Sequence, residues 1–201
     1  MYNLSINRRI DRLISTTLGA SVNDLTVFIG RFSPFHIGHA DVLSRALSSS
    51  KHVLVLIGSS HQSRNVKNPF TWYERGEMIS DWADENGINN RLLIQPISDH
   101  PYNDQEWIAQ VQDIITDVKQ TLRVTQKPKL TGANRDESSW YLQAFGDFFD
   151  LDLISETKAG FTVNATQIRD MYLTGKHGYE AWLPKTTQEF LTKFDAMTGV
   201  L

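Results

Sequence analysis

The chain has 201 residues, of which 40% are hydrophobic and 21% are charged, as is ordinary for a globular protein with one α/β domain. A net charge of −3 gives no sign of the basic stripe expected of a nucleic-acid-binding protein, and the absence of cysteine excludes a disulfide framework and a thiolate nucleophile. Because the longest uninterrupted apolar run, residues 53–57, is far too short to span a bilayer, we expect a cytoplasmic protein with no membrane partner.

An amphipathic helix is predicted before the first strand, within residues 1–24. The apolar residues that share one face of this helix are Ile6, Ile10, Leu13, Ile14 and Leu18. Arginine-rich starts that contain Ser and Thr also occur in organelle-targeting peptides, but the acidic residues here are atypical of those. We expect residues 1–24 to be a helical extension that packs on the main domain or mediates oligomer formation.

From residue 25 onward, short apolar runs alternate with segments of helical periodicity, which is the pattern of a parallel sheet covered by helices. The predicted strands span residues 25–29, 53–58, 91–97, 129–132 and 151–154. The predicted helices span residues 40–47, 71–85, 104–122, 140–145, 166–173 and 186–197. We therefore expect an α/β fold with a Rossmann-like five-stranded parallel sheet and helices on both faces. Ligands of such a sheet bind beyond the carboxyl ends of the strands.

The stretch GRFSPFHIGH, residues 30–39, joins the first predicted strand to the first helix and is the most informative part of the sequence. It places His36 and His39 at the turn and in the first helical turn. Unpaired backbone N–H groups and the positive end of the helix dipole point out of such a turn, so a phosphate chain docks there readily. Gly30 and Gly38 let the backbone come close to a ligand. A proline-containing turn with two surface histidines, or a zinc site, is the alternative, but no cysteine is present and nothing nearby supplies further zinc ligands.

A second phosphate-binding element is predicted in VNATQIRDMY, residues 163–172. Thr166 is placed to cap a helix whose first turn holds Arg169. A hydroxyl, helix N–H groups and a guanidinium can then converge on one polyphosphate. A capped helix with an arginine in its first turn is commonplace, so the functional interpretation depends on its occurrence together with the histidine motif, in that order.

These two elements resemble the signature of the nucleotidyltransferase superfamily. Its HxGH element, matched here by residues 36–39, binds the phosphates of a nucleoside triphosphate. Its S-x-T-x-x-R element grips the β- and γ-phosphates. In this sequence Asn164 and Ala165 stand where serines are common. The positions that match the second element are Thr166, Ile168 and Arg169.

Three further blocks narrow the resemblance to nicotinamide mononucleotide adenylyltransferases of the kind known from archaea and from bacterial proteins fused to a Nudix domain. The blocks are NPFTWYER at residues 68–75, DHPYNDQEW at residues 99–107 and GANRDESSWYL at residues 132–142. In the last block Ala133 replaces the usual histidine, and the sequence has no Nudix box. The resemblance covers about residues 27–184, and it implies that residues 25–201 are a nucleotidyltransferase domain.

The resemblance also implies roles for particular residues. The catalytic residues would be His36, His39 and Arg169. The ATP-binding residues would be Gly30, Arg31, Phe32, Gly38, Gly132, Asp136, Thr166 and Ile168. The residues that bind nicotinamide mononucleotide would be Asn68, Arg75, Asp99, Asn103 and Trp107, the last as a platform for the nicotinamide ring.

Several of these positions also have plain structural interpretations, which stay open at this point. Trp107 is either a stacking platform or a core residue at helical spacing, and Arg75 is either a ligand contact or a solvated helix charge. Asp136 either binds ribose hydroxyls or caps the following helix. In the loop after the second strand, His61 and Arg64 either close over the triphosphate or are ordinary loop residues.

The implied reaction is attack by the 5′-phosphate of nicotinamide mononucleotide on the α-phosphorus of ATP, giving NAD and pyrophosphate. This nucleophile is already an anion at pH 7, so no serine, cysteine or carboxylate pair is required. Mg²⁺ would bridge the phosphates with few or no protein ligands. The alternatives are another acceptor (phosphopantetheine, flavin mononucleotide or an alcohol phosphate) and a nucleotide-binding sensor without turnover. The sequence leaves open whether the protein forms a homo-oligomer.

Overall fold

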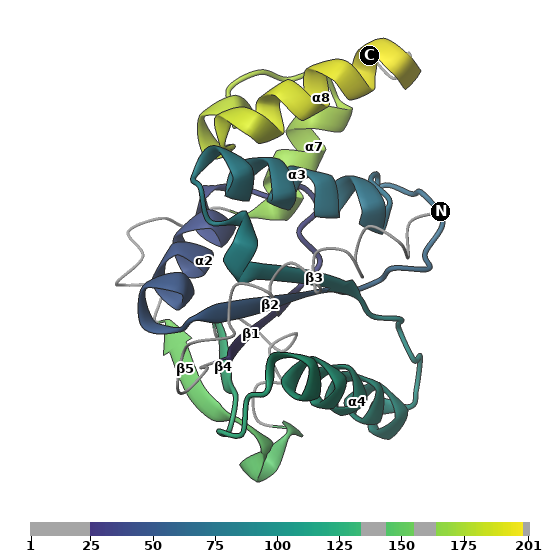
Figure 1. Cartoon of the computed structure of the whole chain (residues 1–201). Helices are drawn as coiled ribbons and strands as arrows, with labels where there is room; N and C mark the ends of the chain where they lie inside the picture. Colours follow the sequence, from purple (N-terminus) through teal and green to yellow (C-terminus); the bar gives the residue numbers. More distant parts are fainter. Residues whose placement is uncertain (1–24, 134–143, 155–163, 199–201) are drawn as a thin grey trace.

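The computed structural model describes residues 25–133, 144–154 and 164–198. They form a five-stranded, wholly parallel sheet with helices on both faces (Figure 1), which confirms the predicted fold class. The helix expected within residues 1–24, most of the one expected at 140–145, and Asp136 lie outside the described residues. No helix in the described part of the chain has both the length and the apolar composition needed to cross a bilayer.

The strand order shows where the direction in which strands are added to the sheet reverses. The strands are β1 (Leu25–Gly30), β2 (His52–Ile57), β3 (Leu92–Pro96), β4 (Lys129–Ala133) and β5 (Asp150–Ile154). Their order in the sheet is β3-β2-β1-β4-β5, so the chain first builds outward from β1 to β3 and then crosses back to place β4 on the other side of β1. The carboxyl ends of β1 and β4 therefore flank the switch point, where ligands of open parallel sheets bind.

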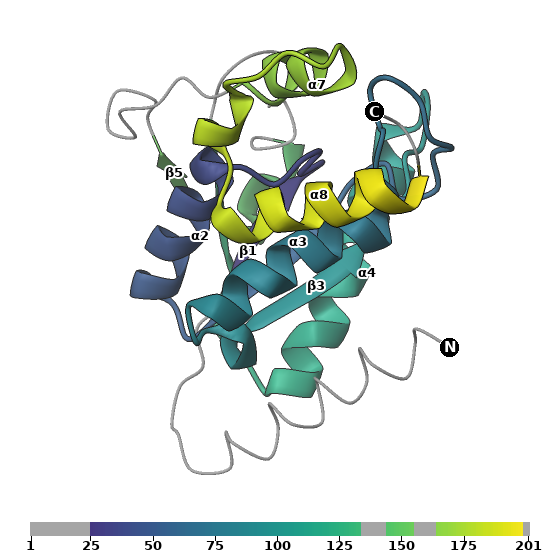
Figure 2. The same ribbon diagram turned by 90° about the horizontal axis from the view of Figure 1, so that it is seen from above.

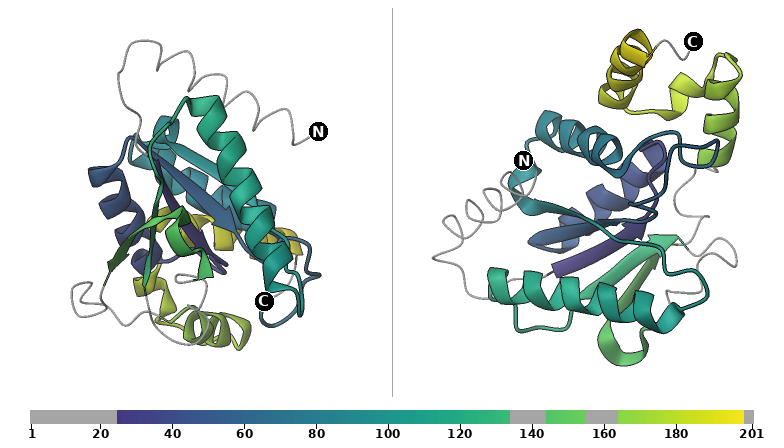
Figure 3. Two further views of the ribbon diagram at one scale, coloured as in Figure 1. Left: turned by 90° about the horizontal axis from the view of Figure 1, so that it is seen from below. Right: turned by 90° about the vertical axis from the view of Figure 1, so that its right-hand side faces the viewer.

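The helices agree with the predicted periodicities to within a few residues. They are α2 (Ile37–Ser49), α3 (Trp72–Glu85), α4 (Asp104–Leu122), α7 (Ala165–Leu173) and α8 (Lys185–Thr198). Short 3-10 helices occur at Asn89–Arg91, Gly146–Phe148 and Tyr179–Trp182. Helices α2 and α3 cover one face of the sheet and α4 covers the other (Figures 1 and 3). Helix α8 packs along α3, as the view from above shows (Figure 2).

Two apolar cores lie on either side of the sheet because successive strand residues point to opposite faces. In β1, Phe28 packs with the helices of the α2 and α3 side, whereas Val27 and Ile29 pack on the α4 side, where Val111 and Ile115 of α4 meet them. Strand β2 is buried along its whole length because helices cover both of its faces. Hydrophobic burial thus holds β1 and β2 in the centre of the molecule, with their carboxyl ends at the switch point.

Candidate active site

His36 and His39 form a reciprocal cap at the start of helix α2, in which the side chain of each histidine bonds to the backbone N–H of the other. Nδ1 of His36 accepts the N–H of His39 and Nδ1 of His39 accepts the N–H of His36, both at 3.4 Å. The two rings are stacked, with centroids 3.6 Å apart. Because both Nδ1 atoms act as acceptors, each neutral ring carries its hydrogen on Nε2. In a neutral ring, the capping arrangement therefore sets the tautomer in which Nε2 is the hydrogen-bond donor.

The turn between β1 and α2 is shaped by Phe32, whose ring folds back over the end of the strand. Phe32 adopts a φ of 52° and its ring packs edge-on against Phe28 at 5.0 Å. A Cβ atom at Gly30 would lie 2.9 Å from the Phe32 Cζ, so a residue without a side chain is required there. Since the Phe32 side chain is buried, the contact with ATP predicted for this residue could involve only its main chain.

Arg169 joins the second predicted motif to the first. Its Nη1 donates to the Ser33 carbonyl at 2.8 Å, across 136 residues of sequence, and its Nη2 donates to the Thr166 Oγ1 at 3.0 Å. The side chain is only 6% exposed, and burial lowers the pKa of its guanidinium, with a further lowering from the nearby charge of Arg31. The structure therefore brings the two predicted phosphate elements together at one end of the sheet.

The cap of helix α7 differs from the prediction. Asn164, not Thr166, is the N-cap, and its Oδ1 accepts the Thr166 N–H at 2.8 Å. An asparagine side chain at the residue before the helix reaches the amide two positions on, which leaves the Thr166 hydroxyl to accept from Arg169. Arg169 consequently lies in the second turn rather than the first. The side chain of Ile168 is fully buried in the core, so only its main chain could approach ATP.

The charge of Arg31 acts on two other guanidinium groups around this turn, those of Arg75 and Arg169. Burial lowers the pKa of Arg75 to about 10, and the charge of Arg31 acts in the same direction while that of Asp99 opposes it. The charge of Arg31 lowers the pKa of Arg169 as well. A pKa near 10 still leaves Arg75 protonated at neutral pH. The carboxyl end of β1 is therefore an electropositive region suited to a polyanion.

Arg75 is not the solvated helix charge that the sequence left open, because its side chain is 1% exposed. Its guanidinium donates to the carbonyl oxygens of Arg31 at 2.6 Å, Gly58 at 2.8 Å, Ser59 at 3.1 Å and Thr71 at 3.2 Å. Main-chain oxygens thus occupy the donors that the sequence assigned to nicotinamide mononucleotide. Arg75 is therefore a buried bracket, that is, a side chain that joins the loop after β1 to the loop after β2 through hydrogen bonds to their carbonyl oxygens.

Polar residues join the loops that follow β2 and β3. The carboxylate of Asp99, an exposed residue, accepts from the Ser59 hydroxyl and from the Gln62 side-chain amide, both at 3.2 Å. His61 contributes a second link, since its Nδ1 is 2.9 Å from the Ser98 hydroxyl. Sequence reasoning missed Ser59 and Gln62, because no motif marks a serine or glutamine whose partner lies on another strand. The expectation that His61 closes over the triphosphate stays a prediction.

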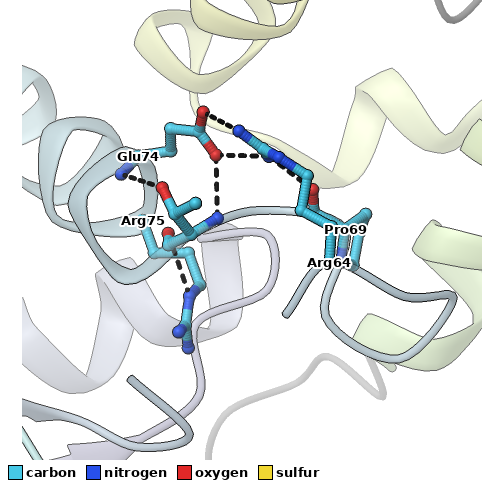
Figure 4. Close-up of polar contacts among 5 residues, drawn as sticks. Arg64, Pro69, Glu74 and Arg75 are labelled. Atoms are coloured by element: carbon cyan, nitrogen blue, oxygen red, sulfur yellow. Dashed lines mark hydrogen bonds and ion pairs between the residues drawn. The ribbon is translucent and has the colours of Figure 1, made fainter. Parts of the chain in front are cut away.

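Arg64 forms an ion pair rather than standing open to a ligand (Figure 4). Its two Nη atoms donate to the two carboxylate oxygens of Glu74 at 2.7 and 2.6 Å, and Nη1 also donates to the Pro69 carbonyl. Its guanidinium lies 5.2 Å from the ring centroid of Phe194 on α8. Burial raises the pKa of Glu74, but the hydrogen bonds from Arg64 and Thr71 outweigh that effect and hold it below its usual value. These contacts favour the structural interpretation of Arg64.

The remaining residues predicted to bind the acceptor lie around α3 and α4. Asn68 is buried, and within the described part of the chain no donor reaches its Oδ1. Asn103 caps α4, with its Oδ1 accepting the Glu106 N–H at 3.1 Å. Trp107 is half-buried, packs against the α4-side core and lies 5.8 Å from the Phe145 ring. Packing of Trp107 is thus observed, and stacking on a nicotinamide ring stays a prediction.

The glycines and the acidic residues complete the description of the site. Gly38 lies in the first turn of α2, and Gly132 lies in β4, beside β1. Among the described residues, no group of three or more His, Asp or Glu side chains is arranged to hold a metal ion. Around the histidine turn the described polar groups are imidazoles, guanidinium groups, the Thr166 hydroxyl and main-chain groups.

Comparison with known proteins identifies the family. Residues 27–171 match the cytidylyltransferase-like family. The chain belongs to this family. It is 36% identical to the nicotinamide/nicotinic acid mononucleotide adenylyltransferase of Acinetobacter baylyi, over 85% of this chain and 86% of that protein. It is 30% identical to the nicotinamide-nucleotide adenylyltransferase of Thermococcus onnurineus, over 87% of this chain and 85% of that protein.

A solved structure gives the same result. The bifunctional NMN adenylyltransferase/ADP-ribose pyrophosphatase of Francisella tularensis, crystallised with AMP and a Mn ion, superposes with a TM-score of 0.74 at 28% identity. The match covers 89% of this chain and 51% of that protein, so the chain spans about half of its length. The resemblance predicted from the sequence and the enzyme class, nucleotidyltransferase, are confirmed by these comparisons.

Proposed function

We propose that this protein transfers the adenylyl group of ATP to nicotinamide mononucleotide, forming NAD and pyrophosphate. The observation that carries the proposal is the hydrogen bond from Arg169 to the Ser33 carbonyl, which unites the α7 motif with the histidine turn in one electropositive site. We infer the acceptor, nicotinamide mononucleotide, from the names of relatives that align over more than four-fifths of the chain. The acceptor phosphate is an anion at pH 7, so the protein needs no general base to activate it.

Catalysis by these residues rests on alignment and charge neutralisation. The Nε2 donors of His36 and His39 would bind oxygens of the α- and β-phosphates, since capping fixes the tautomer. Arg169, supported by Thr166, would hold the β- and γ-phosphates and stabilise the charge that develops on departing pyrophosphate. Because the guanidinium is anchored on the Ser33 carbonyl, little reorganisation would be required during the reaction.

A divalent cation, Mg²⁺ by preference, would act together with ATP. The Francisella protein was crystallised with a Mn ion, and the cationic residues of this site fit a metal that is carried by phosphate and water oxygens. Such a cation supplies further neutralisation of phosphate charge. On the acceptor side, Asn68, Asp99, Asn103 and Trp107 stay our assignments for the mononucleotide, and Asp136 and Gly132 for ATP. The cytoplasmic location also stays a prediction.

The proposal is tested with purified protein, ATP, nicotinamide mononucleotide and MgCl₂, with NAD and pyrophosphate measured separately. Equimolar appearance of both products, abolished by EDTA and restored by excess MgCl₂, is expected. Parallel reactions replace the acceptor with nicotinate mononucleotide, phosphopantetheine or flavin mononucleotide. Pyrophosphate formation with one of the last two and not with nicotinamide mononucleotide would make the acceptor assignment wrong. Binding of ATP without turnover on any acceptor would favour the sensor.

A further inference from the structure

We infer that Arg75 is a positioning residue, whose guanidinium holds the main chain after β1 and the main chain after β2 at the separation that adenylyl transfer requires. This inference rests on the proposed function. It concerns a residue that acts through other groups, because its hydrogen bonds run to main-chain oxygens.

The bracket joins two loops through a single nitrogen atom. Nη1 of Arg75 donates both to the Arg31 carbonyl and to the Gly58 carbonyl, which belong to the loops after β1 and β2. The Gly58 N–H in turn donates to the Gly30 carbonyl at 2.9 Å. The start of the second loop therefore contacts the end of β1 directly. Arg75, which belongs to the helix that follows the second loop, joins the two loops themselves.

The two loops that Arg75 joins are connected to the binding sites that we assign to different substrates. Arg31 and the turn after it lead to the histidine motif, which we assign to ATP. Ser59 accepts from Arg75 through its carbonyl and donates through its hydroxyl to Asp99, which we assign to the acceptor. A shift of the Arg75 guanidinium would thus change the relative position of the two substrates rather than the binding of either one.

The charge of Arg75 is balanced by carbonyl dipoles instead of a carboxylate. The carboxylate next to it in sequence, Glu74, is engaged by Arg64 on the other side of the helix start (Figure 4). The charges of Asp99 and, less strongly, Glu74 raise the pKa of Arg75, but they do not offset the lowering caused by burial. A lysine would keep the charge but could not reproduce the planar fork that spans oxygens of two loops. Arg75→Lys therefore separates charge from geometry.

The chain offers a matched control at the opposite end of the sheet. Arg91, the last residue of the 3-10 helix before β3, also donates to main-chain carbonyls, those of Leu47, Ser50 and Lys51. These oxygens lie at the end of α2 and before β2, far from the carboxyl ends of the strands. Arg91→Lys removes the same kind of bracket without touching the site, so it measures the structural cost alone.

The experiment compares kcat, both KM values and melting temperature for wild type, Arg75→Lys, Arg75→Gln and Arg91→Lys. Both Arg75 variants are expected to lose about tenfold to 100-fold in kcat, the scale of a small misalignment of reacting groups, with each KM changed less than about threefold. Arg75→Lys should retain more activity than Arg75→Gln. Arg91→Lys should lower the melting temperature by a similar amount and keep kcat.

Four results would overturn the inference. A raised KM for nicotinamide mononucleotide with normal kcat would make Arg75 a direct ligand. Normal kcat and KM in a less stable protein would leave it with a purely structural role, as would failure of both Arg75 variants to fold where Arg91→Lys folds. Amide hydrogen exchange of residues 30–39 and 58–64 gives a readout independent of turnover, and it should be faster in Arg75→Lys and unchanged in Arg91→Lys. An inactive wild type would refute the proposed function, whereas unchanged exchange in Arg75→Lys would refute the bracket.

Discussion

The ATP side and the acceptor side of the proposed site are built differently. On the ATP side His36 and Arg169 are buried and His39 is half-buried, and all three are anchored on the backbone, since the two histidines accept main-chain N–H groups at a helix start and Arg169 donates to a carbonyl. On the acceptor side the polar groups of Asp99 and Asn103 are exposed, and they bond mainly to neighbouring side chains and a helix start. This contrast indicates a preorganised phosphate site beside an adaptable acceptor site.

The strongest test of the contrast removes the anchored groups. His39→Ala and Arg169→Ala should each lower kcat by about 100-fold or more, because each removes a fixed donor to a phosphoryl group that gains charge. Steady-state kinetics with both substrates saturating measures the effect. Arg45→Ala, which removes an exposed arginine from α2 paired with Asp41, is the control and should keep wild-type kcat. Near-normal turnover in either site variant would remove that residue from the catalytic set.

A smaller and selective effect is expected at Trp107. If its ring supports nicotinamide, Trp107→Ala loses about 1 kcal/mol of stacking, so the KM for nicotinamide mononucleotide should rise about fivefold before that for ATP changes. Trp107→Phe should recover most of the loss. A lower melting temperature with an unchanged KM in the folded protein would show that the residue serves only the packing seen against Phe145.

The two asparagine caps allow the two sides to be compared by the same substitution. Asn164→Ala and Asn103→Ala should each cost about 1 kcal/mol of stability, because each removes a side-chain acceptor from a helix start. Thermal unfolding measures that shared cost. We expect Asn164→Ala to raise the KM for ATP and Asn103→Ala to raise the KM for nicotinamide mononucleotide. Equal effects on both KM values in both variants would contradict the division of the site into two sides.

The smallest effect concerns acid stability, through Glu74. Its pKa is lowered in the folded protein, so the stability from its pairing with Arg64 is present above its unfolded value of 4.5 and is lost as pH falls through the lowered folded value. Urea unfolding between pH 6 and pH 3 should show this loss in wild type. Arg64→Met should reduce it, by less than about 1 kcal/mol because Arg64 is partly exposed. If the free energy of unfolding of Arg64→Met depended on pH as that of the wild type does, the loss of stability in acid could not be attributed to the Glu74–Arg64 pair.

Much of the fold was predictable because its signals are local. The five strands and helices α3 and α4 follow from apolar periodicity, and the predicted bounds agree closely. The cap of α7 was predicted wrongly because Asn164 and Thr166 are both good capping residues, and only the backbone conformation decides between them. The assignment of Asp136 lies outside the described residues.

By itself the sequence determined the order of elements, the phosphate-binding motifs and the family, since these depend on residue type and on spacing along a strand or helix. Only the tertiary structure decided which charges are buried and what they contact. Arg64, Arg75 and Arg169 look alike in the sequence, yet one pairs with a carboxylate, one brackets two loops and one reaches a carbonyl 136 residues away. The physical reason is that the partner of a long side chain is set by the packing of distant segments, and burial makes the hydrogen-bond partners of Arg75 and Arg169 obligatory.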